Sequence, residues 1–406
     1  ATISFLASCA NAKLNSEIKT YDEINKNVKA RPVASVYTPQ ARVNTTINQS
    51  LSNTQTVSGA DNTLVIGSGG TIQVSGGNSQ AVNFQQNSST TTFLNQGTLI
   101  GGSNAASVQL GANKNNGVTI ETFDNQGIIG NGSSKFGITV WGKGDNKSTI
   151  NNFSNSETIH SDAGESIYFS NVNISSFANS GAIKSNSGKG VNIVSGVNIQ
   201  TFNNNGFISG SEGVSLSSGT INSFNNNGTI NGNSSGIFVL GGIIQTLENS
   251  GTIISNGNYS NHAGIKLENG GSIENIINTG TIESNYSGIM VTWGKFGTLT
   301  IKDGGVIHGK YIGIGVGQWQ TLGDLYIDGA SSKKDGTASG VYGDSYGISL
   351  DVHSQTQKIE LTNGGVIKGD ISGIRLDSGA SLSGEMILSG EGSRVEGGSD
   401  AGIFNF

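Results

Sequence analysis

The chain has 406 residues with 63 glycines and only 2 prolines, and 12% of its residues are charged. A formal net charge of −6 argues against a nucleic-acid partner, because the chain has no basic stripe that could neutralise phosphates. The glycines lack the three-residue period of collagen, and they accompany alternating aliphatic residues that argue against disorder.

Residues 1–9 resemble the end of a signal segment. They are largely apolar, do not begin with Met and finish with Leu6-Ala7-Ser8-Cys9, which is similar to the lipobox of bacterial lipoprotein precursors. Cys9 is the only cysteine, and in such precursors this residue becomes the lipidated N-terminus. A lipid on Cys9 would hold the protein on a membrane through this anchor alone, and no apolar run of about 18 residues predicts a transmembrane helix.

Residues 10–50 are predicted to form an N-terminal helix and a linker. Apolar residues recur three or four positions apart between Leu14 and Val28, which indicates a short amphipathic helix that ends before Arg31-Pro32. This helix would either cover the open edge of the first β coil or tether a lipid to it, and the sequence leaves both roles open.

Residues 51–406 carry a repeat whose clearest copy is Phe224-Asn-Asn-Asn-Gly-Thr-Ile230. Its pattern is an apolar residue, Asn two positions later and Gly four positions later, and most copies lie about 22 to 30 residues apart, which is typical of solenoids. Most copies precede a Gly and alternating aliphatic residues, as in Gly213-Val-Ser-Leu216, which indicate a further strand. The copies begin at Phe93, Phe123, Phe153, Phe177, Phe202, Phe224, Leu247, Ile276, Ile301 and Leu361.

This pattern predicts an all-β protein, a right-handed parallel β-helix with three-strand coils and about 11 to 13 rungs over residues 51–406. One interval is about twice as long as the others, so a divergent rung is expected near Leu325 to Ile327. Because stacked coils lie about 4.8 Å apart, the repeated Phe residues should stack on one another inside the solenoid.

The repeated asparagines are predicted to form a structural ladder at a corner of the coils. Asn tolerates left-handed backbone angles, and its amide can bond to the copies above and below it. The predicted ladder comprises Asn95, Asn125, Asn155, Asn179, Asn204, Asn226, Asn249, Asn278 and Asn363.

No catalytic residue, cofactor or metal site is predicted. A β-helix enzyme that acts on polysaccharides would need carboxylates that converge on one face, but the acidic residues here occur singly along the chain. The four histidines, His160, His262, His308 and His353, lack the spacing of zinc ligands.

Tryptophans are the candidate contact residues. Trp141, Trp293 and Trp319 each follow an alternating strand, where a loop should protrude, and the first two share the phrases Trp141-Gly-Lys143 and Trp293-Gly-Lys295. Exposed Trp suits stacking on sugar rings or anchoring in a protein partner. The alternative is that each Trp folds back over its own coil.

The lipobox-like start, the single cysteine and the Asn-x-Gly-Thr-Ile repeats resemble the passenger domains of type V autotransporters, in particular autotransporter lipoproteins. The resemblance implies a bacterial outer-membrane protein, displayed on the extracellular face, that adheres to host epithelial cells. The family also has a C-terminal translocator β-barrel, and the sequence up to Phe406 lacks its strand pattern, so a passenger fragment is expected. In this context Glu283-Ser-Asn285-Tyr-Ser287 fits an acidic N-glycosylation sequon, although chance explains the match equally well.

Two function hypotheses follow. The first is a monomeric, non-enzymatic adhesin, in which a long stalk presents shallow surfaces to a protein or glycan receptor on the host cell. The second is a β-helix carbohydrate-active enzyme or a tailspike-like polysaccharide depolymerase, which predicts two or three carboxylates on one face of the solenoid.

Overall fold

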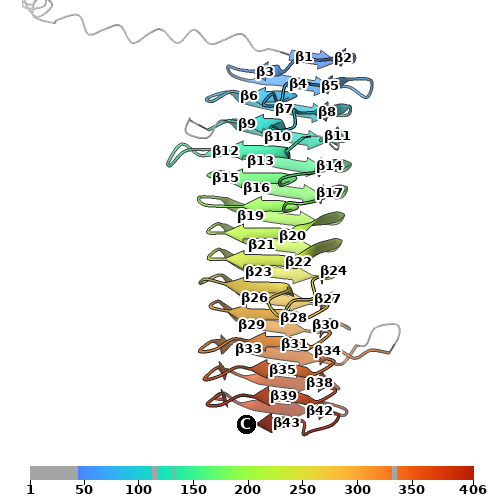
Figure 1. The fold of residues 1–406 in the computed structure, drawn as a ribbon, viewed down its shortest axis with the longest axis vertical. Helices are drawn as coiled ribbons and strands as arrows, with labels where there is room; N and C mark the ends of the chain where they lie inside the picture. The colour runs from blue at the N-terminus through green and yellow to red at the C-terminus, as the bar shows by residue number, and fades with distance from the viewer. Residues whose placement is uncertain (1–43, 112–116, 131–133, 332–335) are drawn as a thin grey trace, which may run out of the picture. The chain divides into compact units, whose positions relative to one another are not determined.

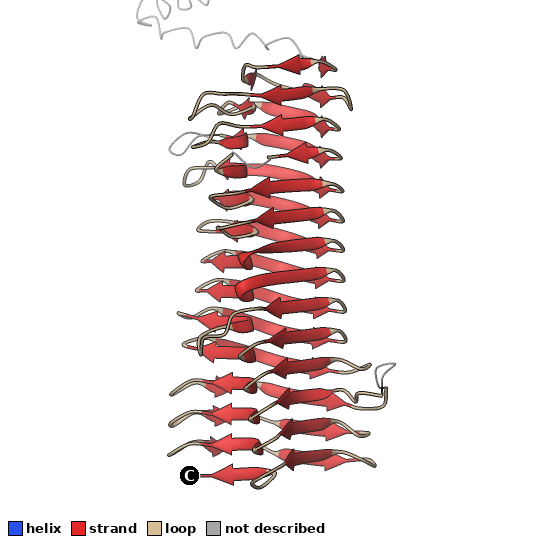
Figure 2. Cartoon of the chain, turned by 45° about the vertical axis from the view of Figure 1, so that its right-hand side comes forward, coloured by secondary structure: helices blue, strands red, loops and turns tan. Residues whose placement is uncertain are grey.

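The computed structural model describes residues 44–111, 117–130, 134–331 and 336–406. Cys9 and the helix predicted before Arg31 lie outside this part of the chain. The described residues form a parallel β-solenoid of about 13 turns and contain no helix (Figures 1 and 2). None of them therefore forms a helix that is long and apolar enough to cross a membrane.

Each coil contributes one strand to a 14-stranded parallel sheet, which we call the first face. We name each coil after its strand in this face. The coils stack in chain order, from the blue end to the red end of the ribbon (Figure 1). The strands of the first face are β1 (Asn44–Ile47), β4 (Asn62–Ile66), β7 (Ser89–Asn95), β10 (Thr119–Asn125), β13 (Ser148–Asn155), β16 (Val172–Asn179), β19 (Asn198–Asn204), β21 (Thr220–Asn226), β23 (Ile243–Asn249), β26 (Ser272–Asn278), β29 (Lys295–Ile301), β33 (Asp324–Asp328), β37 (Ile359–Thr362) and β41 (Met386–Ser389).

The remainder of each coil contributes to the second and the third face. The second face contains β2 (Ser50–Leu51), β5 (Thr71–Gln73), β8 (Thr98–Ile100), β11 (Ile128–Ile129), β14 (Thr158–Ser161), β17 (Ala182–Ser185), β24 (Thr252–Ser255), β27 (Thr281–Ser284), β30 (Val306–Gly309), β34 (Gly340–Gly343), β38 (Val366–Gly369) and β42 (Arg394–Gly397). The third face contains β3 (Gln55–Val57), β6 (Val82–Phe84), β9 (Ala106–Leu110), β12 (Phe136–Trp141), β15 (Ile167–Ser170), β18 (Val191–Ile193), β25 (Ala263–Glu268), β28 (Ser287–Thr292), β31 (Ile312–Val316), β35 (Tyr346–Leu350), β39 (Ser372–Leu376) and β43 (Ile403–Asn405).

Two long strands, β20 (Phe207–Ser217) and β22 (Thr229–Leu240), run through both of these faces and join them into one 26-stranded sheet. A small third sheet contains β32 (Thr321–Leu322), β36 (Gln355–Thr356) and β40 (Ser381–Leu382). The solenoid already includes β1, which pairs with β4, although the sequence analysis places these residues in the linker before residue 51.

Repeated residues of neighbouring coils lie opposite one another in the parallel register. Phe153 pairs with Phe123 and Phe177, and the same column continues through Phe202 and Phe224. Their rings are buried, and the centroids of consecutive rings lie 4.3 to 4.8 Å apart from Phe93 to Phe224. The predicted aromatic stack is therefore present in the core.

The alignment of the later coils differs from the sequence-based one by two residues. Ile276 pairs with Leu299, whereas Ile301 pairs with Asn278 and continues as Ile327 and then Leu361. The prediction placed Ile301 and Leu361 in the column of the Phe residues and was wrong there. A shift of two residues keeps every side chain on the same face of a strand, so the alternation of apolar residues could not reveal it.

Candidate functional site

The asparagines of the repeat form a buried ladder where the first face ends. From Asn95 to Asn249, each side-chain amide donates to the amide oxygen of the Asn in the next coil, at 2.6 to 2.8 Å. The last member, Asn278, donates to the Val306 carbonyl at 3.1 Å. These side chains are at most 1% exposed, so they stabilise the corner and offer no surface to a ligand. The ladder consists of Asn95, Asn125, Asn155, Asn179, Asn204, Asn226, Asn249 and Asn278.

Asn363 does not belong to this ladder, and the prediction was wrong for this residue. It lies at an exposed turn with a backbone φ of 51°, and its side-chain amide donates to Asp328 Oδ1 at 3.1 Å. Beyond Asn278 the buried column continues with Ile301, Ile327 and Leu361. Leu361 occupies the position of the ladder asparagine, and Asn363 lies two residues beyond it. The sequence Leu361-Thr-Asn363 therefore resembles the repeat motif, but it is shifted by two residues relative to the coils before it.

Trp141 and Lys143 take different positions although they adjoin in sequence. Trp141 is the last residue of β12, is only partly exposed, and packs its ring 4.6 Å from the ring of Tyr168 in the next coil. Lys143 is exposed in a tight turn whose backbone bonds pair it with Asn146. Trp141 therefore folds over the neighbouring coil rather than projecting from it.

Trp293 and Trp319 project from the turn that connects the third face to the next first-face strand. We call this turn the third corner. Their exposed fractions are 63% and 62%, and the Trp319 ring lies 4.2 Å from that of His353. Lys295 is also exposed and lies near Glu274, with 4.0 Å between Nζ and Oε1. Trp293, Trp319 and His353 occupy the third corner in three successive coils.

All three residues adopt left-handed backbone angles. The φ values are 61° for Trp293, 62° for Trp319 and 57° for His353. Bulky residues rarely adopt this conformation, which costs about 1 to 2 kcal/mol in an L-residue. In other coils the left-handed position of this corner holds small or turn-forming residues, namely Asn171, Gly196, Ser218, Gly241, Gly270 and Gly379.

A second site lies on the second face, where sequence reasoning found none. The registers align Glu283, His308, Tyr342 and Lys368 in one column of successive coils. His308 Nε2 lies 3.1 Å from Asp344 Oδ1. These residues line two adjoining hollows of about 360 Å³ and about 280 Å³, which share His308 and Asp344. We call the two hollows together the second-face groove.

Polar surface predominates in the first hollow of the second-face groove, whereas the open surface of the second hollow is mainly apolar. The first hollow is also lined by Asn256, Asn285 and Lys310, and Asn285 donates its amide to the Asn256 carbonyl at 2.8 Å. In the second hollow, Tyr342 donates its hydroxyl to the Ala338 carbonyl at 2.8 Å. Burial raises the pKa of the Tyr342 hydroxyl above its ordinary value.

The sequence hides this groove because its members lie far apart along the chain. His308 and Asp344 are 36 residues apart, since the β33 coil has a long connection between its first-face and second-face strands. Only the register of β30 with β34 brings them together. The signal available in the sequence was a His and an Asp, each one residue from the Gly that ends a second-face strand, as in His308-Gly309 and Gly343-Asp344.

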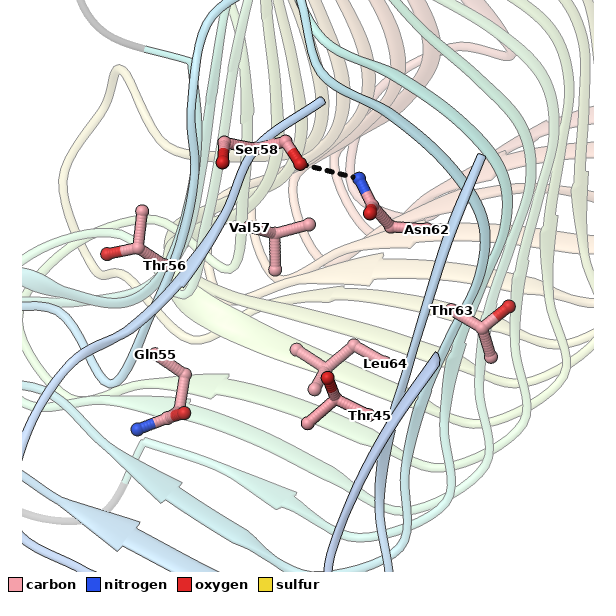
Figure 3. A pocket seen from close by; sticks show the side chains of 8 residues that line it. All are labelled: Thr45, Gln55, Thr56, Val57, Ser58, Asn62, Thr63 and Leu64. Atoms are coloured by element: carbon pink, nitrogen blue, oxygen red, sulfur yellow. Dashed lines mark hydrogen bonds between the residues drawn. The ribbon is translucent and has the colours of Figure 1, made fainter. Parts of the chain in front are cut away.

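A further, smaller hollow of about 110 Å³ lies near the first described coils (Figure 3). Val57 and Leu64 point into it, and Asn62 donates its amide to the Ser58 carbonyl at 3.0 Å. Its lining contains no titratable side chain, so it offers no acid, base or charged anchor.

Comparison with protein-family models, with curated proteins and with solved structures gives no match to this chain. Function must therefore be argued from the surface itself. Among the described residues, no group of three or more His, Cys, Asp or Glu side chains is placed to hold a metal ion. Within the described part of the chain, the exposed aromatic residues of the third corner and the second-face groove are two features with ligand-binding chemistry.

Proposed function

We propose that this chain is the passenger part of an autotransporter-type protein on the bacterial cell surface and acts as a non-enzymatic adhesin for host epithelial cells. The observation that supports this proposal is the presence of Trp293 and Trp319 in left-handed corner positions. A backbone outlier at an exposed position costs stability, and such strain is typically retained where the side chain serves binding.

The geometry suits adhesion through shallow contacts. The two indole rings present large, flat, exposed surfaces on successive coils, and Trp is among the residues that dominate binding energy in interfaces. The solenoid beneath them is held by continuous ladders of hydrogen bonds, so the contacts are presented on a rigid support. Many copies on one cell would add avidity to weak individual contacts.

The proposal is tested by the adhesion of epithelial cells to beads that carry the whole chain. A double variant, Trp293→Gly and Trp319→Gly, should reduce saturable binding at least tenfold, the factor that about 1.4 kcal/mol of lost binding energy produces. A matched variant, Ile128→Ala and Ile243→Ala, removes two exposed apolar side chains from other coils and should bind normally. Equal binding by all three proteins would refute the role of the third corner.

Trp293→Gly alone should weaken binding without destabilising the fold. Gly adopts the left-handed conformation without strain, which should raise the free energy of unfolding by about 1 to 2 kcal/mol. The greater freedom of Gly in the unfolded chain should lower it by about 0.5 to 1 kcal/mol. The free energy of unfolding should therefore stay constant or rise by up to about 1.5 kcal/mol. Trp293→Ala is the control, because it keeps the Cβ and the strain and should be less stable than Trp293→Gly in thermal unfolding.

A polysaccharide-active enzyme is the second candidate. The observation that favours it is the convergence of Glu283, His308 and Asp344 on the second-face groove. Glycoside hydrolysis uses a pair of carboxyl groups, and Glu283 and Asp344 are the two that line the first hollow. Release of shortened oligosaccharides from a polysaccharide, lost in Glu283→Gln, would favour this candidate over the adhesin.

A further inference from the structure

The second-face groove runs along the solenoid axis. Glu283, His308, Tyr342 and Lys368 project from successive coils of the second face, and their strands pair in register. Adjacent strands lie about 4.8 Å apart, so the groove presents a new polar side chain at each such step. A linear polymer that lies parallel to the axis would meet one of these side chains after another.

An aromatic side chain lines the groove. Tyr342 lines the second hollow, beside His308 and Lys368. Its side chain is only partly buried, so part of its ring is open to a ligand. Aromatic faces beside hydrogen-bonding groups match sugar rings, which have apolar faces and hydroxyl-bearing edges.

The charges of the groove exclude a polyanion. Two lysines, Lys310 and Lys368, face three carboxylates, those of Glu283, Asp344 and Asp370. Lys368 is already paired with Glu396 at 3.1 Å. A nucleic acid or a sulfated chain would meet more negative than positive charge here, which opposes binding.

The hydrogen-bonding groups favour a ligand with many hydroxyls. Asn256, Asn285 and the His308–Asp344 pair supply both donors and acceptors within one hollow. A hydroxyl can donate and accept at once, so neighbouring sugar hydroxyls can satisfy such mixed groups. An apolar peptide would cover these groups without bonding to them, which opposes its binding.

We propose that the second-face groove binds an uncharged linear glycan, which lies parallel to the solenoid axis and stacks on Tyr342. This site shares no lining residue with the third corner, and it stands whether or not the two tryptophans bind cells. It goes beyond the adhesin proposal by naming a second binding surface and the chemical class of its ligand.

The test uses the whole chain and a panel of uncharged hexasaccharides built from glucose, mannose, galactose or N-acetylglucosamine. Calorimetric titration should give saturable binding of at least one member, with Kd in the micromolar to millimolar range that is usual for shallow sites. His308→Ala and Tyr342→Ala should each weaken this binding at least tenfold. Heparin should not compete.

The chain offers a matched control for the His308 variant. His160 occupies the same second-face column several coils earlier and pairs with Asp162 at 2.9 Å. His160→Ala removes the same chemistry from a position outside both hollows and should leave glycan binding unchanged. Circular dichroism of all variants verifies that each keeps its β structure.

The outcomes separate the two proposals. Failure of every hexasaccharide to bind, or binding that survives both groove variants, would overturn the glycan site and leave the adhesion result untouched. Glycan binding that is lost in the groove variants but kept in Trp293→Gly would establish the site independently of the third corner. If mass spectrometry shows that bound hexasaccharides are also cleaved, the glycan site stands and the non-enzymatic function is replaced by the enzyme.

Discussion

Replacing Asn226 with alanine should destabilise the coils around it by about 3 kcal/mol, because the ladder would lose a buried member that both donates and accepts. Its amide donates to Asn249 Oδ1 at 2.7 Å and to the carbonyls of Gly228 and Thr252, and its oxygen accepts from Asn204 at 2.8 Å. Alanine leaves the Asn249 oxygen without its donor and the Asn204 amide without its best acceptor. Each unsatisfied buried group costs about 1 to 3 kcal/mol.

Asn227→Ala provides the control for this prediction. Asn227 is the next residue, has the same side chain and bonds to Asn205 at 2.9 Å, but it is exposed. Water replaces its lost bonds, so its substitution should change the unfolding free energy by no more than about 0.5 kcal/mol. Hydrogen exchange of the coils from β19 to β23 is the suitable measurement, since repeat structures open locally. Equal exchange in both variants would show that the ladder does not contribute to stability.

Phe177→Ala should cost about 3 to 5 kcal/mol, the range found when a large core side chain is truncated. The Phe177 ring lies 4.8 Å from Phe153, 4.3 Å from Phe202 and 6.2 Å from Phe169, and it is fully buried. Its removal creates a cavity between two coils that are fixed by backbone hydrogen bonds on both sides. These coils cannot collapse to fill the space, which places the expected loss at the upper end of that range.

Phe177→Leu is the informative companion variant. Leu247 already occupies the same column, directly after Phe224, so the column accepts this side chain. The expected loss is therefore about 1 to 1.5 kcal/mol. Chemical unfolding followed by fluorescence and by hydrogen exchange distinguishes the two variants. Losses of similar size would mean that aromatic stacking, rather than filled volume, determines the stability of the column.

The sequence predicted the fold well because a solenoid repeats the same local rule in each coil. An apolar residue, Asn and Gly at fixed spacing mark the end of the first face from Phe93 to Asn278, and each copy supports the others. The rule failed where its marker residue changed. From Ile301 onward an aliphatic side chain takes the position of Asn, and Asp303 and Asn363, which lie at turns two residues later, imitate it.

The candidate sites were less predictable, because a difference of one residue in the position of a side chain relative to the end of its strand changes where it lies. Trp141 directly follows Val140 and pairs in register with Ser170, so it is part of a strand. Trp293 follows Val291 by two residues and falls beyond the strand, at the corner. The shared phrase Trp-Gly-Lys hides this difference. The pair of His308 and Asp344 depends on the length of one connection, which no local pattern encodes.

The ladder also bears on how such a protein can change in length during evolution. Asn204 and Asn226 are 22 residues apart and make equivalent bonds to the coils on either side. Recombination within the gene could delete the 22 residues from Asn204 to the residue before Asn226. Asn226 would then take the place of Asn204 and could make the same bonds to the coils on either side. From Asn95 to Asn249 the gene could therefore gain or lose whole coils, and so lengthen or shorten the solenoid, while Trp293, Trp319 and the second-face groove stay intact.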